Sequence, residues 1–221
     1  MSLPLSGPSV PPRSGKAPKQ VVVFVHGLGA DGDDLIGLAP YFAEVLPDAE
    51  FLSPHAPYPC DMAPFGRQWF SLRDFSAEAI TAGLDAVSPL FNSYLDAVLE
   101  SRGLTESELA LVGFSQGTML SLYAALRRRK SVASVVGFSG LLAVPDRLLT
   151  ELSARPPVLL VHGEEDPVVN FGFMDLAARA LDALGVSVET LPRPGLGHSI
   201  DDEGLARSIG FVVEGFNQKQ V

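Results

Sequence analysis

The sequence predicts an α/β fold with a mostly parallel, twisted sheet and helices on both of its faces. Short apolar runs alternate with helix-like patterns along the chain, which is typical of strand–helix units. Several of these runs are apolar at consecutive positions, as expected for parallel strands that helices cover on both sides. With 221 residues, 47% of them hydrophobic, the chain is long enough for one domain with a sizeable core.

Six strands and six helices are expected after the first twenty residues. The predicted strands cover residues 21–27, 49–55, 109–114, 131–139, 157–163 and 186–192. The predicted helices cover residues 33–44, 77–101, 116–129, 146–153, 171–184 and 202–216. Pro89 should kink the second helix or begin a new helix capped by Ser88. The segment 56–76 has three prolines and weak periodicity, and so long an irregular connection in a compact domain is often functional.

Composition and charge narrow the class of protein. Residues 1–20 are rich in Pro, Ser and Gly and lack the apolar core of a signal peptide, so we expect a flexible extension before a single domain at residues 21–221. No apolar run is long enough to cross a bilayer. The single cysteine, Cys60, excludes an internal disulfide framework, and these features together predict a cytoplasmic protein. A net charge of -10 argues against a nucleic-acid partner, because phosphate binding needs a clustered basic surface.

The stretch GFSQG at residues 113–117 predicts a nucleophilic serine, Ser115. It matches the G-x-S-x-G pattern, in which a strand stops, a helix begins and the serine occupies a strained turn between them. Gly113 and Gly117 are needed because the neighbouring backbone comes too close for a Cβ atom. Ser139 lacks the second glycine, so we expect it to be an ordinary strand-end residue.

A serine hydroxyl needs a base to remove its proton. The chain contains four histidines, at His26, His55, His162 and His198. Where a G-x-S-x-G serine is the nucleophile, the acid and then the base follow it along the chain. His162 stands directly before the acid candidates, which leaves His198, in a glycine-rich loop before the last helix. His26 is expected to make structural hydrogen bonds.

The acid candidates are the three carboxylates of the stretch HGEEDPVV. Asp166 is preferred because the turn at Pro167 would carry it past the end of a buried strand toward His198. Glu164 is the alternative acid. In a third interpretation, Glu164, Glu165 and Asp166 are all solvated loop charges.

An HGLG stretch after the first strand is expected to complete an oxyanion hole. The backbone N–H groups of Leu28 and Gln116 are the predicted donors, the second of them at a helix N-terminus, where anions bind favourably. The nearby Asp31, Asp33 and Asp34 lack the spacing of a calcium loop, and Asp33 is expected to cap a helix. No metal site is predicted.

Taken together, these stretches resemble the phospholipase/carboxylesterase family of α/β-hydrolases, which includes the acyl-protein thioesterases. In the family's order they are HGLG, PHAP, WF, GFSQG, HGEEDPVV and GLGHSI, spread over residues 21–216. The resemblance implies an α/β-hydrolase fold with little or no lid, and an esterase that needs no metal or cofactor. It also implies a catalytic triad of Ser115, Asp166 and His198, with the N–H groups of Leu28 and Gln116 as the oxyanion hole.

The sequence departs from the family's pattern at two positions near these motifs. Thr118 follows the second glycine, where eukaryotic thioesterases typically have a small residue, and Ser71 stands where many members have an aspartate. Because of these two departures, the resemblance does not identify the substrate. Trp69 is expected to bind substrate as a wall of the acyl pocket, or else to be a buried core aromatic.

The predicted function is hydrolysis of carboxylic esters of small to medium acyl chain through an acyl-enzyme. The alternative is a lysophospholipase or acyl-protein thioesterase that acts on longer chains. A non-catalytic hydrolase-fold protein that only binds a ligand is disfavoured, because no triad residue is lost. A dienelactone-hydrolase-like function is disfavoured too, because those enzymes place a cysteine where this chain has Ser115. The expected partner is a small-molecule ester or acyl-thioester, and a homodimer is left open.

Overall fold

The protein is built on a mostly parallel seven-stranded sheet. The computed structural model describes residues 4–218. The sheet contains β1 (Ser9–Val10), β2 (Gln20–Val25), β3 (Ala49–Leu52), β6 (Leu109–Phe114), β7 (Ser134–Phe138), β8 (Val158–Gly163) and β9 (Val188–Arg193), and β4 (Tyr58–Pro59) pairs separately with β5 (Arg67–Gln68). The order in the sheet is β1-β3-β2-β6-β7-β8-β9, and every neighbouring pair is parallel except β1 and β3.

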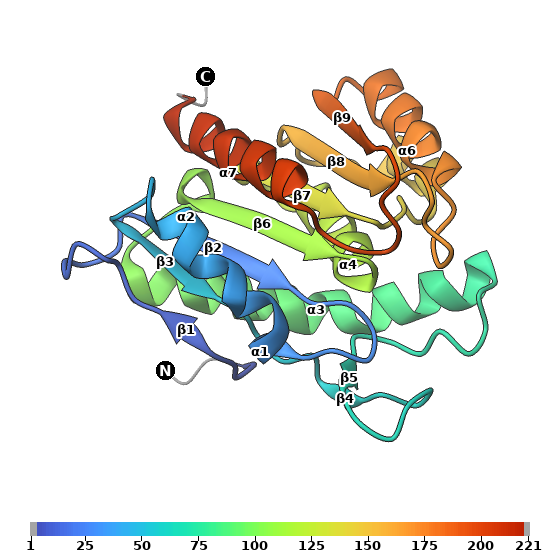
Figure 1. Cartoon of the computed structure of the whole chain (residues 1–221), viewed down its shortest axis with the longest axis horizontal. Helices are drawn as coiled ribbons and strands as arrows, with labels where there is room; N and C mark the ends of the chain where they lie inside the picture. Colours follow the sequence, from blue (N-terminus) through green and yellow to red (C-terminus); the bar gives the residue numbers. More distant parts are fainter. Residues whose placement is uncertain (1–3, 219–221) are drawn as a thin grey trace.

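Helices cover both faces of this sheet (Figure 1). They are α1 (Gly32–Leu35), η1 (Ile36–Leu38), α2 (Ala39–Ala43), α3 (Ala77–Arg102), η2 (Glu106–Glu108), α4 (Gln116–Ala125), η3 (Pro145–Arg147), α5 (Leu148–Glu151), α6 (Gly172–Ala183) and α7 (Asp202–Asn217). Helices α3, α4 and α6 pack on one face, whereas α1, α2 and α7 pack on the other. Within residues 4–218, no helix combines the length and the apolar character that crossing a membrane would require. The predicted fold class is confirmed.

The central strands are apolar at consecutive positions because both faces of the sheet are buried. In β2, Val21, Val23 and Val25 contribute to the core beneath α3, α4 and α6. Val22 and Phe24 point the other way, into the core beneath α1, α2 and α7. Side chains of a strand alternate between its two faces, so a strand covered on both sides is apolar at most consecutive positions.

Ser9 and Val10 belong to the sheet, which corrects the expectation of a flexible extension for the described part of residues 1–20. Strand β1 pairs with β3, so that Ser9 lies opposite Leu52, and Leu5 is buried. The His55 N–H donates to the Ser6 carbonyl at 2.8 Å. An edge strand needs ladder hydrogen bonds on one side only, so a segment rich in proline can still form one. Residues 1–3 lie outside the described part of the chain.

Two local predictions were also wrong: a new helix capped by Ser88, and a helix cap at Asp33. Helix α3 is continuous through Pro89, with Ser76 as its N-cap, because buried residues before and after the proline anchor it to the core. At the start of α1 the capping residue is Asp31, whose carboxylate accepts the Asp33 N–H at 2.9 Å. The helix begins one residue earlier than expected, so the cap moves with it.

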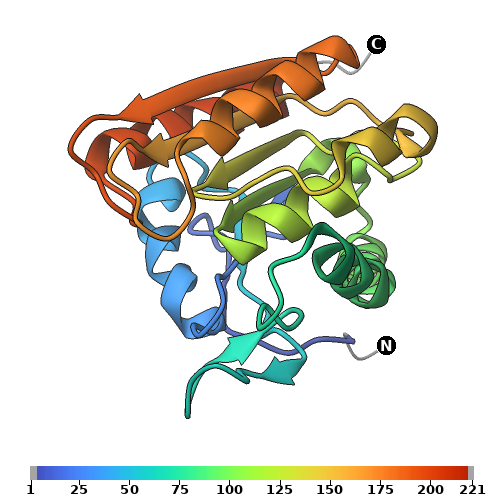
Figure 2. The same cartoon turned by 90° about the vertical axis from the view of Figure 1, so that its right-hand side faces the viewer.

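The carboxyl ends of the parallel strands meet at one edge of the sheet. Gly113 at the end of β6 lies opposite Val25 at the end of β2, and Phe114 lies opposite Phe138 of β7. Figure 2 shows the arrowheads of the later strands, from green to orange, pointing to the same side of the molecule. Ligands of α/β sheets bind at this edge, and the loops that follow the strands carry the candidate site.

Candidate active site

Ser115 occupies a strained turn between β6 and α4. Its φ of 53° and ψ of -115° lie in a region that non-glycine residues rarely adopt. The Ser115 N–H donates to the Phe138 carbonyl at 2.9 Å, so the neighbouring strand holds the turn in place. Such a conformation costs on the order of 1–3 kcal/mol and persists only where the surrounding structure enforces it. It is the sharp strand-to-helix turn predicted from GFSQG.

Backbone-to-backbone contacts explain both glycines of the motif. A Cβ atom on Gly113 would lie 2.6 Å from the carbonyl carbon of Gly117, and one on Gly117 would overlap the carbonyl oxygen of Val25. Any side chain at these two positions would therefore push α4 away from β2 and β6. Gly27 is similarly confined, because a Cβ atom there would lie 3.3 Å from the Cβ atom of Ser115. The HGLG stretch thus lies directly against the serine.

The structure brings Asp166 and His198 together. Asp166 follows β8, His198 lies between β9 and α7, and the distance between Asp166 Oδ2 and His198 Nδ1 is 2.7 Å. Backbone hydrogen bonds join the two loops, since the Glu165 N–H donates to the Leu196 carbonyl at 3.0 Å. The alternative acid, Glu164, is exposed to solvent, as is Glu165.

The Asp166 side chain is fully buried and receives several donors. Its Oδ1 accepts the N–H groups of Val168 at 2.8 Å and Val169 at 2.9 Å. Burial alone would raise the pKa of Asp166, but the hydrogen bonds from His198, Val169 and Val168 outweigh it and lower that pKa below its ordinary value. A carboxylate at neutral pH fixes the His198 proton on Nδ1, which leaves Nε2 free to act as a base.

His162 contacts the same carboxylate, a role that chain order alone did not reveal. Its Nε2 lies 3.2 Å from Asp166 Oδ2 and 2.9 Å from the Val169 carbonyl oxygen. Both neighbours are acceptors, so this nitrogen carries a proton and braces the turn that holds Asp166. The buried position of His162 at the end of β8 excludes it from contact with solvent.

His198 packs against the residue that precedes the serine. The ring centroids of Phe114 and His198 lie 4.8 Å apart. Phe114 is the last residue of β6, and its neighbour Ser115 begins the turn. The serine, the imidazole and the buried carboxylate therefore lie at the same edge of the sheet.

The two predicted oxyanion donors come from elements that frame Ser115. Gln116 is the first residue of α4, and its N–H group has no acceptor within the helix. Leu28 follows Gly27, which lies against Ser115. The Gly29 N–H donates to the Arg67 carbonyl at 2.9 Å, so β5 holds the far end of the HGLG stretch.

Trp69 supports these donors from within the core. Its side chain is fully buried, so the structure matches the core aromatic rather than an open pocket wall. Its indole N–H donates to the His26 carbonyl at 3.0 Å, and its backbone N–H donates to the Gln116 side-chain oxygen at 2.9 Å. His26 in turn accepts the Ala56 N–H at 3.0 Å, and burial lowers the pKa of His26, which keeps it neutral. It makes structural hydrogen bonds, as expected.

An apolar cavity of about 390 Å³ lies beside the turn that holds Asp166, and sequence reasoning missed its lining. One wall comes from the loop 141–145 after β7, and another from Ala77 and Ile80 in the first turns of α3. The third contains Val168 and Val169, whose N–H groups bind Asp166. The available signal was the run LLAV at residues 141–144, which is apolar although it follows the strand.

Replacing Gly117 by alanine should destabilise the fold by roughly 1–3 kcal/mol or more, because the new methyl group meets the Val25 backbone. Gly210→Ala is the matched control. Gly210 lies in α7, where the added methyl group approaches only the flexible end of Arg207, and alanine should stabilise the helix by ~0.5–1 kcal/mol. Urea unfolding of both variants measures the difference, and equal stability would contradict the close contact.

Asp166→Asn should lower stability more at pH 7 than at pH 3. The pKa of Asp166 is depressed in the folded protein, so its charge stabilises the fold above the unfolded pKa of about 4, and this contribution is lost as the pH falls through the folded pKa. Urea unfolding of both proteins at the two pH values checks the sign. A difference in stability that grows toward acid pH would contradict the hydrogen-bonding account.

Comparison with known proteins agrees with this geometry. The family model described as Phospholipase/Carboxylesterase matches residues 10–213. The chain is 30% identical to "Esterase YpfH" of Escherichia coli K12, over 90% of this chain and 82% of that protein. It is 29% identical to "Acyl-protein thioesterase 1" of Gibberella zeae, over 90% of each chain. The crystal structure of esterase PE8 superposes with a TM-score of 0.91 at 38% identity, covering 95% of this chain and 98% of that one.

The family match spans nearly the whole chain and includes every motif discussed above. The resemblance drawn from the sequence is thereby confirmed. This chain belongs to the phospholipase/carboxylesterase family.

Proposed function

We propose that this protein hydrolyses carboxylic esters of small to medium acyl chain by a serine mechanism. The observation that carries the proposal is the 2.7 Å contact between the buried Asp166 carboxylate and His198, at the sheet edge where Ser115 occupies a strained turn. Family membership and the esterases among its relatives support the reaction class. The proposed substrate is a small-molecule ester or acyl-thioester.

In the proposed reaction, Ser115 Oγ attacks the carbonyl carbon while His198 Nε2 takes the serine proton. Asp166 holds the Nδ1 proton of His198 and stabilises the imidazolium. The N–H groups of Leu28 and Gln116 bind the oxyanion. The protonated His198 then gives its proton to the leaving alcohol. Water activated by His198 finally hydrolyses the acyl-serine.

The apolar cavity is the proposed site for the acyl chain. Its walls adjoin both ends of the machinery: Leu141 follows Gly140, where a Cβ atom would lie 3.0 Å from the Ser115 carbonyl oxygen, and Val169 binds Asp166. Each methylene group buried there contributes about 0.8 kcal/mol. An acyl chain would therefore bind with its carbonyl carbon directed toward the serine.

One observation favours the alternative of a longer acyl chain. A second apolar hollow of about 160 Å³ shares Leu142, Pro145 and Phe173 with the main cavity. Val168 and Leu176 beside them are each 62% exposed, so apolar surface continues beyond the cavity. A lysophospholipase or acyl-protein thioesterase could bind a longer chain along this surface.

The cytoplasmic location predicted from the sequence stays a prediction.

Ser115→Ala should reduce kcat for p-nitrophenyl butyrate on the order of 10⁴–10⁶-fold while the protein stays folded, because the nucleophile is lost. Ser121→Ala is the matched control, since Ser121 is a buried serine of the adjoining helix whose hydroxyl has no hydrogen-bond partner within the described residues. It should retain near-normal turnover. A folded Ser115→Ala protein with near-normal activity would overturn the assignment.

The acyl-chain preference separates the two candidate substrates. Steady-state kcat/KM for p-nitrophenyl esters of two to twelve acyl carbons should peak at short to medium length if the 390 Å³ cavity limits the chain. An optimum at the long end of the series would favour the lysophospholipase or thioesterase alternative.

A further inference from the structure

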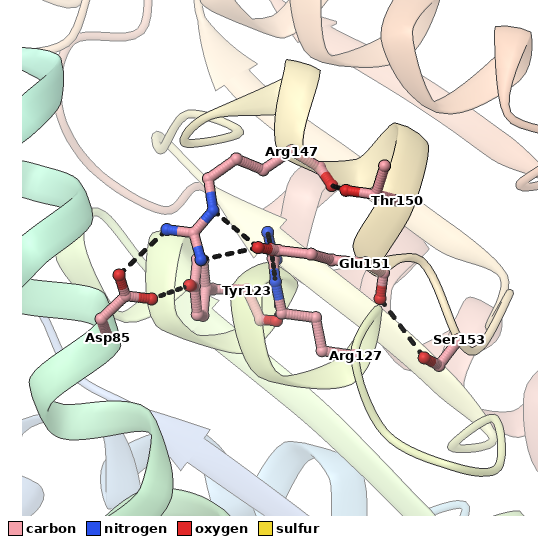
Figure 3. Close-up of polar contacts among 7 residues, drawn as sticks. All are labelled: Asp85, Tyr123, Arg127, Arg147, Thr150, Glu151 and Ser153. Atoms are coloured by element: carbon pink, nitrogen blue, oxygen red, sulfur yellow. Dashed lines mark hydrogen bonds and ion pairs between the residues drawn. The ribbon is translucent and has the colours of Figure 1, made fainter.

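A network of charged and polar side chains joins α3, α4, η3 and α5 beside the cavity (Figure 3). Arg147 of η3 donates through Nη1 to Asp85 of α3 at 3.0 Å and through Nε to Glu151 of α5 at 2.7 Å. The Tyr123 hydroxyl of α4 donates to the other oxygen of Asp85. Arg127 donates to Glu151 at 2.7 Å and stacks on the Tyr123 ring. We call Asp85, Tyr123, Arg127, Arg147 and Glu151 the clamp.

The clamp is anchored to the core on one side. Tyr123 is only 4% exposed, and burial raises its pKa to about 12, so its hydroxyl remains a proton donor. The hydrogen bond from Arg147 lowers the pKa of Asp85, so this carboxylate is charged at neutral pH. An exposed ion pair alone contributes little stability, but here one carboxylate, Asp85, accepts hydrogen bonds both from the buried Tyr123 and from Arg147. The arrangement fixes Arg147 relative to α3 and α4.

The segment that Arg147 holds carries backbone strain at the cavity wall. Val144 lines the cavity with a φ of 46° and a ψ of 58°, a left-handed conformation that is a genuine outlier for a β-branched residue. The Arg147 N–H donates to the Val144 carbonyl at 3.1 Å. Strain of this kind persists only where neighbouring contacts enforce it, and the clamp begins three residues later.

The two parts that the clamp joins each contribute residues to the lining of the cavity. Asp85 lies little more than one helical turn after Ile80, which lines the cavity from α3. Arg147 lies two residues after Pro145, the end of the loop wall 141–145. The distance between these walls therefore depends on whether Arg147 and Asp85 stay paired.

We infer that the clamp determines acyl specificity by fixing the size of the cavity between α3 and the loop 141–145, so that it admits short acyl chains and excludes long ones. The inference rests on the proposed ester hydrolysis at Ser115. Asp85 and Arg147 touch neither the serine nor the acid–base pair, so they act as positioning residues. Releasing them should change which acyl chains bind, and leave the chemistry of small esters intact.

Arg147→Met and Asp85→Asn test the clamp, and Arg207→Met is the matched control. Arg207 is also a partly exposed arginine that pairs with two carboxylates, Glu189 and Glu214, but it lies in α7 on the other face of the sheet. The measurement is kcat/KM for p-nitrophenyl butyrate and p-nitrophenyl decanoate, with thermal melting to show that each variant is folded. Calorimetric binding of butyrate and decanoate gives a readout that does not need turnover.

Both clamp variants should raise the decanoate-to-butyrate ratio of kcat/KM roughly tenfold, mainly through a lower KM for the longer ester. Decanoate binding should tighten in parallel, and the control should keep the wild-type ratio. Unchanged ratios and unchanged decanoate binding in both folded variants would overturn the inference. If the wild-type protein hydrolysed no ester of the series, the proposed function would be wrong. The change in decanoate binding between wild type and clamp variants would then still test whether the clamp limits the acyl chain.

Discussion

The structure depends on one close backbone contact, between the first turn of α4 and the end of β2. Gly117 permits it, because any side chain there would overlap the Val25 carbonyl. This contact forces the chain from β6 into α4 through Ser115, which takes up the strain. It also brings the HGLG stretch against the serine and places the Gln116 N–H beside it. A single constraint on backbone distance thus positions the proposed nucleophile and the proposed oxyanion donors.

Electrostatics fixes the other half of the site. Asp166 is buried, yet stays charged because two backbone N–H groups and His198 donate to it. A buried carboxylate that accepts no hydrogen bonds would be strongly destabilising. These three donors are therefore what allows Asp166 to be both buried and charged. The loops that carry Asp166 and His198 are joined by their own backbone bonds, so the pair is formed before any substrate arrives. The proposed acyl transfer would therefore need little reorganisation of this pair.

Much of this could be predicted from the sequence, because local patterns report local structure. Strand β6 was predicted at its observed bounds, since an apolar run ends in a motif that demands a turn. Strand β1 was missed because its pairing with β3 is a long-range contact that leaves no pattern in a proline-rich segment. The prediction of a new helix at Pro89 was wrong because packing of the residues on both sides of the proline outweighed the loss of one hydrogen bond. The cavity and the clamp could not be predicted either, because they depend on long-range contacts such as the one between Asp85 and Arg147.

The proposed reaction passes through a covalent acyl-enzyme at the strained turn. The most direct measurement is mass spectrometry of the protein after brief reaction with p-nitrophenyl butyrate and acid quench, followed by peptide mapping. We expect the mass of one butyryl group on the peptide that contains Ser115, appearing before the steady state and disappearing when the ester is exhausted. A protein that turns over the ester with no acyl group on Ser115, or with the group on another residue, would contradict the account.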